Sequence, residues 1–273
     1  MTQDQEGQVA RPFLKWAGGK GRLLDQYAAY FPRQYRTYFE PFLGGGAVFF
    51  HLRPQQAVLT DINPHLVNIY RCVRDQVEFL IPLLQDHQAQ HGPDYYYRIR
   101  ALQPEDPVHQ AARLLYLNKT CFNGLYRENA SGQFNVPIGR YRNPRICDPT
   151  LLRAASQALQ GSDLQVQPFE AILEAATPAD FVYFDPPYHP LSATSSFTAY
   201  NRHSFGEADQ IRLQDVFATL AARGVPVMLS NSDCQWIRTL YQDFPVHTIT
   251  AARAINSKAQ RRGKITEVLV TSA

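Results

Sequence analysis

Residues 181–188 read Phe-Val-Tyr-Phe-Asp-Pro-Pro-Tyr, four apolar residues followed by a carboxylate, two prolines and an aromatic ring. A short continuous apolar run of this kind is typical of a buried strand in a parallel sheet. Asp185 then emerges at the carboxyl edge of the strand, which is where open α/β sheets bind their ligands. Because Pro186 and Pro187 fix φ and offer no N–H donor, this turn presents a rigid set of hydrogen-bond acceptors.

An acceptor set at such an edge suits an amine that donates hydrogen bonds. An amine conjugated with an aromatic ring is a poor nucleophile, and acceptors for its hydrogens favour a pyramidal nitrogen whose lone pair can point at an electrophilic methyl group. Tyr188 adds an aromatic face of the kind that holds an unstacked base. We therefore interpret residues 185–188 as a catalytic motif, the alternative being that the two prolines merely end a strand.

Short apolar, β-prone runs recur along the chain between helical patterns, which predicts an α/β fold with a mainly parallel sheet. No convincing helical pattern separates the last two runs, because the stretch 253–264 is basic and polar. We expect these two runs to form an antiparallel hairpin at the sheet edge. The seven candidate strands are 37–41, 57–60, 164–166, 181–184, 226–230, 246–250 and 267–271.

About a hundred residues lie between the second and third candidate strands, far more than a normal connection contains, so we predict an inserted domain. Residues 67–84 and 109–117 carry apolar side chains at helical spacing. Residues 118–144 are rich in Asn, Gly, Arg and aromatic residues and contain the turn signals Asn123-Gly124 and Ser131-Gly132. We therefore expect a mainly helical insertion whose second part is rich in turns.

Basic side chains concentrate in and around this second part, where a single acid, Glu128, opposes them. The whole chain has a formal net charge of only +3, too small to indicate a nucleic-acid partner by itself. On charge alone, a solvated surface and a nucleic-acid-binding surface are equally good interpretations. The basic residues are Arg113, Lys119, Arg127, Arg140, Arg142 and Arg145.

The composition is that of a globular protein, with 45% hydrophobic and 19% charged residues among 273. No stretch approaches the roughly 18 to 20 apolar residues that span a bilayer, and the first ten residues carry Asp4 and Glu6 without a hydrophobic segment. The 4 cysteines and 8 histidines are scattered without metal-ligand or disulfide spacing. We therefore expect a cytoplasmic protein with no membrane association and no metal.

A glycine-rich turn follows the first candidate strand, where residues 39–46 read Phe-Glu-Pro-Phe-Leu-Gly-Gly-Gly and a helical pattern begins at Ala47. Glycines there let the backbone approach a ligand closely and adopt positive φ. The next strand ends at Asp61, at a distance suited to a carboxylate that accepts hydrogen bonds from ribose hydroxyls. Because no Gly-Lys-Ser/Thr follows these glycines, an adenosine cofactor without phosphates fits best, although NAD stays open as an alternative.

These motifs resemble those of the Dam family of DNA adenine-N6 methyltransferases (D12 class), and the match runs through nearly the whole chain after the first ten residues. Residues 13–20, Phe-Leu-Lys-Trp-Ala-Gly-Gly-Lys, resemble the family's amino-terminal cofactor motif. The stretches 40–46 and 185–188 are similar to its glycine loop and its catalytic motif. The runs 190–194 and 197–200 are similar to the segment that follows the catalytic motif.

The resemblance implies a Rossmann-like methyltransferase domain, residues 11–66 and 145–273, around an inserted target-recognition domain, residues 67–144. It also implies S-adenosyl-L-methionine as the cofactor and S-adenosyl-L-homocysteine as the product. From the residues alone, Trp16 and Phe169 fit core positions as well as cofactor contacts. The cofactor contacts implied by the resemblance are Trp16, Lys20, Glu40, Gly44, Gly46, Asp61, Phe169 and Asp185.

The same resemblance implies that the basic insertion binds double-stranded DNA. Phe122, where some relatives have Tyr, matches an aromatic wedge that fills the gap left by a flipped adenine. Arg127 matches a position that reads guanine, and Leu125 one that contacts a thymine methyl. Lys15 fits a base or a phosphate contact, and Arg98 fits a backbone contact or plain surface. The implied DNA contacts are Lys15, Arg98, Phe122, Asn123, Leu125, Arg127, Asn135, Pro137 and Arg140.

We therefore predict a site-specific DNA adenine-N6 methyltransferase that acts on a flipped adenine at GATC and associates with the nucleoid through DNA, without an obligate protein partner. A methyltransferase paired with a restriction enzyme is an alternative of the same class. Methylation of RNA or of protein glutamine uses similar acceptor chemistry, but the aromatic, arginine-bearing insertion argues against it. The intact carboxylate and prolines disfavour a non-catalytic DNA-binding module, and the missing G-x-G-x-x-G pattern disfavours a Rossmann-type oxidoreductase.

Overall fold

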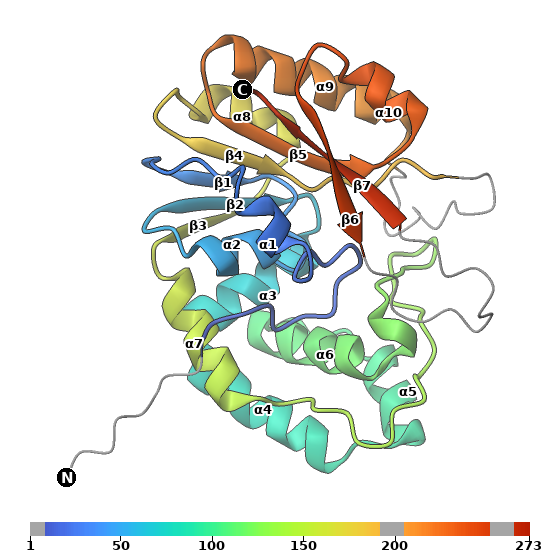
Figure 1. Ribbon diagram of the computed structural model, residues 1–273. Coiled ribbons are helices and arrows are strands. Elements are labelled where there is room, and N and C mark those ends of the chain that lie inside the picture. Colours follow the sequence, from blue (N-terminus) through green and yellow to red (C-terminus); the bar gives the residue numbers. More distant parts are fainter. Residues whose placement is uncertain (1–8, 192–204, 252–264) are drawn as a thin grey trace.

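The computed structural model describes residues 9–191, 205–251 and 265–273 (Figure 1). The parts of the family resemblance at 192–194 and 197–200, and the basic stretch 253–264, lie outside the described residues. Among the residues that the structure describes, no helix is both long and apolar enough to cross a membrane.

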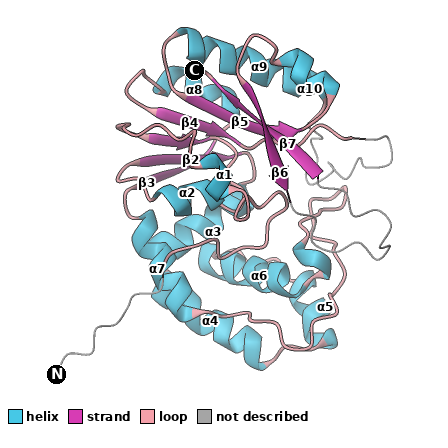
Figure 2. Cartoon of the chain, in the orientation of Figure 1, coloured by secondary structure: helices cyan, strands magenta, loops and turns pink. Residues whose placement is uncertain are grey.

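Within the described ranges, one sheet of seven strands forms the centre of the molecule (Figure 2). Its strands are β1 (Tyr38–Glu40), β2 (Ala57–Asp61), β3 (Ser162–Val166), β4 (Phe181–Phe184), β5 (Val227–Ser232), β6 (Val246–Ala251) and β7 (Ile265–Thr271). Their spatial order is β3-β2-β1-β4-β5-β7-β6. Pairing is parallel from β3 to β5, whereas β7 runs antiparallel to both β5 and β6. The predicted α/β sheet with an antiparallel edge hairpin is confirmed.

Several strands extend beyond the apolar runs that predicted them, for example β3 and β5. β3 begins at Ser162, which pairs with Ala57 of β2. β5 continues to Ser232, whose partner on β7 is Glu267. Backbone N–H and C=O groups form the hydrogen bonds of a sheet whatever side chain the residue carries. A strand can therefore include polar residues that a prediction from apolar patterns leaves out.

The predicted helical run 67–84 forms two helices rather than one, α3 (Pro64–Asp75) and α4 (Val77–Ala89). The chain leaves helical geometry between them at Gln76, where φ is −136°. α3 begins earlier than predicted because the side chain of Asn63 caps it, accepting hydrogen bonds from two backbone N–H groups of the first turn. Continuous apolar spacing does not reveal a one-residue break that contains neither Gly nor Pro.

The predicted helix 109–117 lies within α6 (Pro107–Thr120), and the helix expected from Ala47 is α2 (Ala47–Leu52). Shorter and longer helices fill the remaining connections. They are α1 (Leu24–Tyr27), α5 (Pro93–Ala101), α7 (Pro149–Leu159), α8 (Ile172–Ala175), α9 (Glu207–Ala222) and α10 (Gln235–Leu240), with 3-10 helices η1 (Phe122–Gly124) and η2 (Phe169–Ala171).

Helices cover both faces of the sheet (Figure 1). On one face, α8, α9 and α10 pack against a core that includes Val182 and Phe184 of β4. On the other face, Tyr183 and Leu59 belong to a larger core that continues into α3, α4 and α6. Successive strand residues point to opposite faces, so β4 contributes to both cores. Because the larger core runs without interruption from the sheet into the insertion, the domain boundaries at 66/67 and 144/145 stay a prediction.

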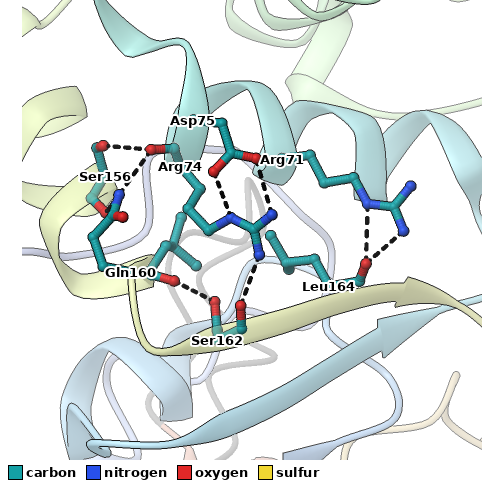
Figure 3. A network of polar contacts seen from close by, with 8 residues as sticks. Arg71, Arg74, Asp75, Ser156, Gln160, Ser162 and Leu164 are labelled. Atoms are coloured by element: carbon teal, nitrogen blue, oxygen red, sulfur yellow. Dashed lines mark hydrogen bonds and ion pairs between the residues drawn. The ribbon is translucent and has the colours of Figure 1, made fainter.

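Polar contacts bind α3 to the edge of the sheet (Figure 3). The guanidinium of Arg71 donates twice to the carbonyl of Leu164 in β3, at 3.0 and 2.5 Å. Arg74 Nη1 donates to the carbonyl of Ser162 at 2.7 Å. From α7, the hydroxyl of Ser156 donates to the carbonyl of Arg74 at 2.9 Å. These bonds fix the first helix of the insertion against β3, next to the strand that carries Asp61.

Candidate active site

A cavity of about 1030 Å³ opens at the carboxyl ends of the parallel strands. Its walls come from the loops that follow β1 to β4, from the amino-terminal residues 16–20, from Ser232 at the end of β5, and from Phe205, Asp209 and Arg212 in and just before the first turns of α9. Open α/β sheets bind ligands at this edge. Every residue that the sequence predicted for catalysis or cofactor binding lines the cavity. They are Trp16, Lys20, Glu40, Gly44, Gly46, Asp61, Phe169, Asp185, Pro186, Pro187 and Tyr188.

The glycine-rich turn after β1 uses backbone conformations that residues with a side chain adopt at a cost. Gly44 has φ +47° and Gly46 has φ +65°. The N–H of Gly44 donates to Asp61 Oδ2 at 3.2 Å, and its carbonyl accepts from the hydroxyl of Tyr70 at 3.0 Å. The turn is thereby tied to the end of β2, and together they form one wall of the cavity.

Asp61 presents a carboxylate to the cavity at the end of β2. Its Oδ1 accepts from the N–H of Asn63 at 2.9 Å, while Oδ2 accepts from Gly44. Burial raises the pKa of Asp61 to about 6, and the N–H donors of Asn63 and Gly44 oppose this shift. A carboxylate offers about four lone-pair sites, so acceptor capacity is left for two ligand hydroxyls. This arrangement fits the ribose of an adenosine cofactor.

Glu40 lies at the end of β1, buried beside the cavity. The hydroxyl of Tyr38 donates to Glu40 Oε2 at 2.9 Å. Burial raises the pKa of Glu40 well above its usual range, against the lowering effect of the Tyr38 hydrogen bond. The shift favours the neutral acid, which can donate to a ligand as well as accept from one.

Asp185, directly after β4, receives two contacts on the same carboxylate oxygen. Lys20 Nζ lies 2.8 Å from Oδ1, and Ser230 Oγ donates to Oδ1 at 2.8 Å. The side chain of Lys20 is 2% exposed and also donates to the carbonyl of Gly18 at 2.6 Å. A buried ammonium requires such partners, so Lys20 and Asp185 hold each other in place.

Sequence reasoning missed several residues that contact the catalytic motif, among them Ser230 and Glu267. Ser230 of β5 donates to Asp185, and Glu267 of β7 accepts from the hydroxyl of Tyr188 at 2.6 Å. Burial raises the pKa of Tyr188 well above its usual range, and the charge of Asp185 adds to the effect, so the phenol stays a donor. A signal for Ser230 exists, because the apolar run 227–232 ends in Ser-Asn-Ser at the ligand-binding edge. No comparable local signal marks Glu267.

Trp16 and Phe169, which fit either core positions or cofactor contacts by sequence, pack against core residues and also border the cavity. Trp16 packs against Tyr126, with ring centroids 5.6 Å apart. Phe169 is 6% exposed and stacks on Phe42, with centroids 5.5 Å apart. Both rings also line the cavity. Core packing is therefore shown for both, while their contact with a cofactor stays a prediction.

The predicted recognition hairpin has two arms that antiparallel bridges hold together. These bridges join Cys121 to Ile138 and Glu128 to Phe134. The ring of Phe122, at the start of the first arm, is 49% exposed. It is therefore accessible to another molecule, as the wedge prediction requires.

Most of the other predicted DNA contacts lie in the same hairpin. Arg127 Nε donates to Asn135 Oδ1 at 2.6 Å, so two of these residues bond to each other across the arms. The carbonyl of Pro137 accepts from the N–H of Phe122 at 2.9 Å. Leu125 is partly buried against the larger core. The exposed members of the predicted set in this hairpin are Phe122, Asn123, Arg127, Pro137 and Arg140.

Lys15 lies against the hairpin although it belongs to the amino-terminal cofactor segment. The amide of Asn118 accepts from the N–H of Lys15 at 2.9 Å and donates to its carbonyl at 2.7 Å. Lys15 Nζ lies 3.9 Å from the centre of the Tyr141 ring. Arg98 is exposed on α5, where its guanidinium lies 4.9 Å from the centre of the Tyr95 ring. The structure thus places Lys15 with the hairpin and Arg98 on a separate helix.

No group of three or more His, Cys, Asp or Glu side chains within the described ranges is placed to hold a metal ion. The cysteines are free thiols, buried at Cys72, Cys121 and Cys147 and partly exposed at Cys234. Whether the protein works without a metal stays a prediction.

Comparisons with known proteins place the chain in a family. The family described as D12 class N6 adenine-specific DNA methyltransferase matches residues 16–255. The chain is 46% identical to Type II methyltransferase M1.LlaDCHI of Lactococcus lactis subsp. cremoris, over 96% of this chain and 95% of that protein. It is 39% identical to Type II methyltransferase M.MjaIII of Methanocaldococcus jannaschii, over 92% and 95%. It is 36% identical to DNA adenine methylase of Escherichia coli K12, over 95% and 94%.

Proposed function

The chain belongs to the D12 class of N6 adenine-specific DNA methyltransferases, and from that membership we propose that it transfers a methyl group from S-adenosyl-L-methionine to N6 of an adenine flipped out of duplex DNA, at GATC. The observation that carries this proposal is the convergence of all predicted catalytic and cofactor residues on one cavity. The amine-accepting motif at 185–188 and the ribose-accepting Asp61 therefore face the same space.

The cofactor side of the cavity suits an adenosine with a sulfonium side chain. We assign Asp61 to the ribose hydroxyls, because its carboxylate faces the cavity with spare acceptor capacity. Phe169 offers an aromatic edge to the adenine of the cofactor, and Trp16 closes the wall beside Gly44. When bound, the cofactor supplies an electrophilic methyl group and leaves as S-adenosyl-L-homocysteine.

The catalytic side of the cavity orients the amine. Among the contacts of the described residues, Lys20 and Ser230 both use Oδ1 of Asp185, so we assign Oδ2 to a hydrogen of the adenine amine. Accepting that hydrogen favours a pyramidal nitrogen, and fixing the nitrogen in line with the methyl group supplies most of the rate enhancement. Tyr188, held at its hydroxyl by Glu267, offers its ring as a stacking surface for the flipped base.

The hairpin supplies recognition in this proposal. Phe122 fills the vacated stack, and Arg127 reads a guanine through O6 and N7. Leu125 contacts a thymine methyl, while Asn123, Asn135 and Pro137 contribute further base or phosphate contacts. Arg98 contacts the DNA backbone, Arg140 contacts a base or a phosphate, and Lys15 contacts a base at the start of the site or a phosphate. Binding to DNA would place a cytoplasmic protein in the nucleoid.

A second biological role, modification in partnership with a restriction enzyme, is favoured by one finding. Two of the relatives are named Type II methyltransferases. The chemistry of the cavity is the same in both roles. The sequence that is methylated and the genes beside the coding sequence separate them.

The proposal is tested by incubating the protein with S-adenosyl-L-methionine carrying a labelled methyl group. Unmethylated duplex DNA, single-stranded DNA, RNA and a bulk protein fraction serve as acceptors in parallel. We expect label in duplex DNA, recovered as N6-methyladenine after digestion to nucleosides. Label recovered mainly from RNA or protein, or as methylcytosine, would refute the proposal.

A further inference from the structure

We propose that Gln210 and Asn231 form an amide clamp that fixes the backbone on both sides of Tyr188 and thereby positions the catalytic motif. The inference rests on the proposed function, since it concerns the geometry of the same site. Gln210 lies in the first turns of α9, and Asn231 lies near the end of β5. Among the described residues, the lining of the cavity includes neither side chain, so both act through Tyr188 and its neighbours.

The clamp is a continuous chain of hydrogen bonds. Gln210 Nε2 donates to the carbonyl of Pro187 at 2.8 Å. Asn231 Nδ2 donates to Gln210 Oε1 at 3.0 Å. The N–H of His189 donates to Asn231 Oδ1 at 3.1 Å. The peptide groups immediately before and after Tyr188 are therefore bound to the same pair of side chains.

Both amide side chains of the clamp are buried, so water cannot replace the hydrogen bonds between them and the backbone. Gln210 is 1% exposed and Asn231 is 0% exposed. A buried amide that lacks hydrogen-bond partners is destabilising, so the two side chains are stable in this place only while the chain of bonds is complete. Each amide uses its nitrogen as a donor and its oxygen as an acceptor, which fixes the orientation of both groups.

The sequence of the motif explains why such a clamp is needed. Pro186 and Pro187 have no N–H, so the chain beyond β4 cannot continue the ladder of the sheet. The turn therefore needs side chains to hold its remaining polar groups. The clamp meets this need from two elements that are packed into the fold, and Glu267 holds the other end of Tyr188 through its hydroxyl.

Three hydrogen bonds thus hold Tyr188, at its hydroxyl, at the preceding carbonyl and at the following N–H, and Lys20 Nζ lies 4.5 Å from the centre of its ring. The ring is the surface on which the base is proposed to stack, and Asp185 lies three residues earlier in the same turn. A displacement of about 1 Å in such a site can cost on the order of a hundredfold in rate. We therefore assign Gln210 and Asn231 as positioning residues whose loss lowers kcat more than it raises KM.

The test compares two substitutions at Gln210: Gln210→Met removes both the donor to Pro187 and the acceptor for Asn231, whereas Gln210→Glu keeps the acceptor. Gln210→Met has no donor and should lower kcat on the order of ten- to a hundredfold at every pH. Gln210→Glu donates only while the introduced carboxyl is protonated, and burial raises the pKa of that carboxyl. Its kcat should therefore approach that of the wild type at low pH and fall as the pH rises through this pKa, so the profile is followed up to about pH 10. KM for duplex DNA and Kd for S-adenosyl-L-homocysteine should stay within about threefold of wild type, because the cavity lining is unchanged.

Gln214→Glu is the matched control, because it adds the same charge one turn further along α9. It should keep the wild-type pH profile. If Gln210→Met does not fold, as circular dichroism would reveal, the pH profile of Gln210→Glu decides alone. A kcat of Gln210→Met within twofold of wild type, or a wild-type pH profile for Gln210→Glu, overturns the clamp while leaving the proposed function intact. A wild-type protein that transfers no methyl group to adenine overturns the proposed function instead, and the clamp with it.

Discussion

A Cβ atom placed on Gly44 would lie 2.9 Å from Cδ1 of Trp16. The glycine turn after β1 and the amino-terminal segment are therefore packed so closely that no side chain fits between them. Gly44 also has φ +47°, a conformation that residues with a side chain rarely adopt. Sterics and backbone geometry both require glycine at this position, and both act on the wall of the cavity assigned to the cofactor.

The first prediction concerns this contact. Gly44→Ala should weaken the binding of S-adenosyl-L-homocysteine at least tenfold, because the indole of Trp16 or the turn must move. The free energy of unfolding should fall by about 1–3 kcal/mol, the usual cost of an unfavourable backbone conformation. Titration calorimetry and urea denaturation measure the two effects. Gly21→Ala is the control, since a Cβ at Gly21 meets nothing within 4 Å. Equal affinities for both variants would contradict the assignment of this wall.

The second prediction is a pH dependence of cofactor binding. Burial raises the pKa of Asp61 to about 6, so in the free protein this carboxyl becomes protonated as the pH falls below about 6. Ribose hydroxyls that donate to Asp61 favour the ionised form. Affinity for S-adenosyl-L-homocysteine should therefore be constant above pH 7 and fall about tenfold per unit below pH 6.

Calorimetry between pH 5 and 8 measures this dependence. Asp61→Asn should bind weakly at every pH and lose the slope, because its amide does not titrate. A wild-type affinity that is flat across this range would show that the ionised carboxyl is not used.

The third prediction concerns Asp185. Asp185→Ala should abolish methyl transfer and Asp185→Asn should impair it severely, while both proteins fold with a lower free energy of unfolding because the buried Lys20 loses its charged partner. The reason for the lower activity is the loss of the acceptor that we assign to the amine at the edge of the sheet. Ser230→Ala removes only one of the two donors to Oδ1 and should cost less, on the order of tenfold. Turnover is measured with S-adenosyl-L-methionine saturating; values within a few-fold of wild type for both Asp185 variants would overturn the assignment.

The sheet was predictable because its signals are local. The apolar run 181–184 matches β4 residue for residue, and the missing helical pattern after residue 251 indicated the edge hairpin. The break at Gln76 was not predictable, since apolar spacing continues across it without Gly or Pro. Helical periodicity indicates which side chains face a core, but it does not indicate where one helix ends and the next begins.

The residues that line the cavity were predictable where they belong to a sequence motif. The contacts that hold those residues in place, from Ser230 and Glu267, were not predictable. Asp185 and Ser230 are separated by 45 residues, and Tyr188 and Glu267 by 79. The first contact depends on β5 lying beside β4, and the second depends in addition on β7 lying beside β5, an order that local patterns leave open. The hydrogen bonds between Asn118 and Lys15 also join residues far apart in the sequence, 103 positions, and no local pattern predicts them.

The fourth prediction is that the target base leaves the helix on binding, because N6 and the methyl group cannot align within an intact duplex. Duplex DNA with 2-aminopurine at the target position should gain fluorescence when the protein binds. Phe122→Ala should reduce this gain, because the vacated stack loses its aromatic filler. Unchanged fluorescence with an active enzyme would count against flipping, and an unaffected Phe122→Ala would count against the wedge.

The fifth prediction is that the preferred site is GATC, methylated on its adenine, and that Arg127 reads one guanine of the second half-site. Arg127 is exposed on the hairpin, and its Nε donates to Asn135 Oδ1 at 2.6 Å, a bond that orients the guanidinium before DNA arrives. An arginine bidentate to guanine typically contributes about 1–3 kcal/mol of discrimination, roughly 5- to 150-fold. Arg127→Ala should therefore relax selectivity at one base pair.

Arg140→Ala is the comparison that distinguishes recognition of a base from electrostatic binding to the phosphates. Arg140 is exposed at the end of the same hairpin, and if it contacts only phosphate, its loss should weaken binding to all sequences alike and flatten the salt dependence. Sequencing the methylated adenines after reaction on random-sequence DNA measures both variants in one experiment. A consensus other than GATC would overturn the site assignment while leaving the chemistry untouched. A selectivity profile of Arg127→Ala identical to that of wild type would overturn the role of this arginine, because a residue that reads a base cannot be removed without a change at that base.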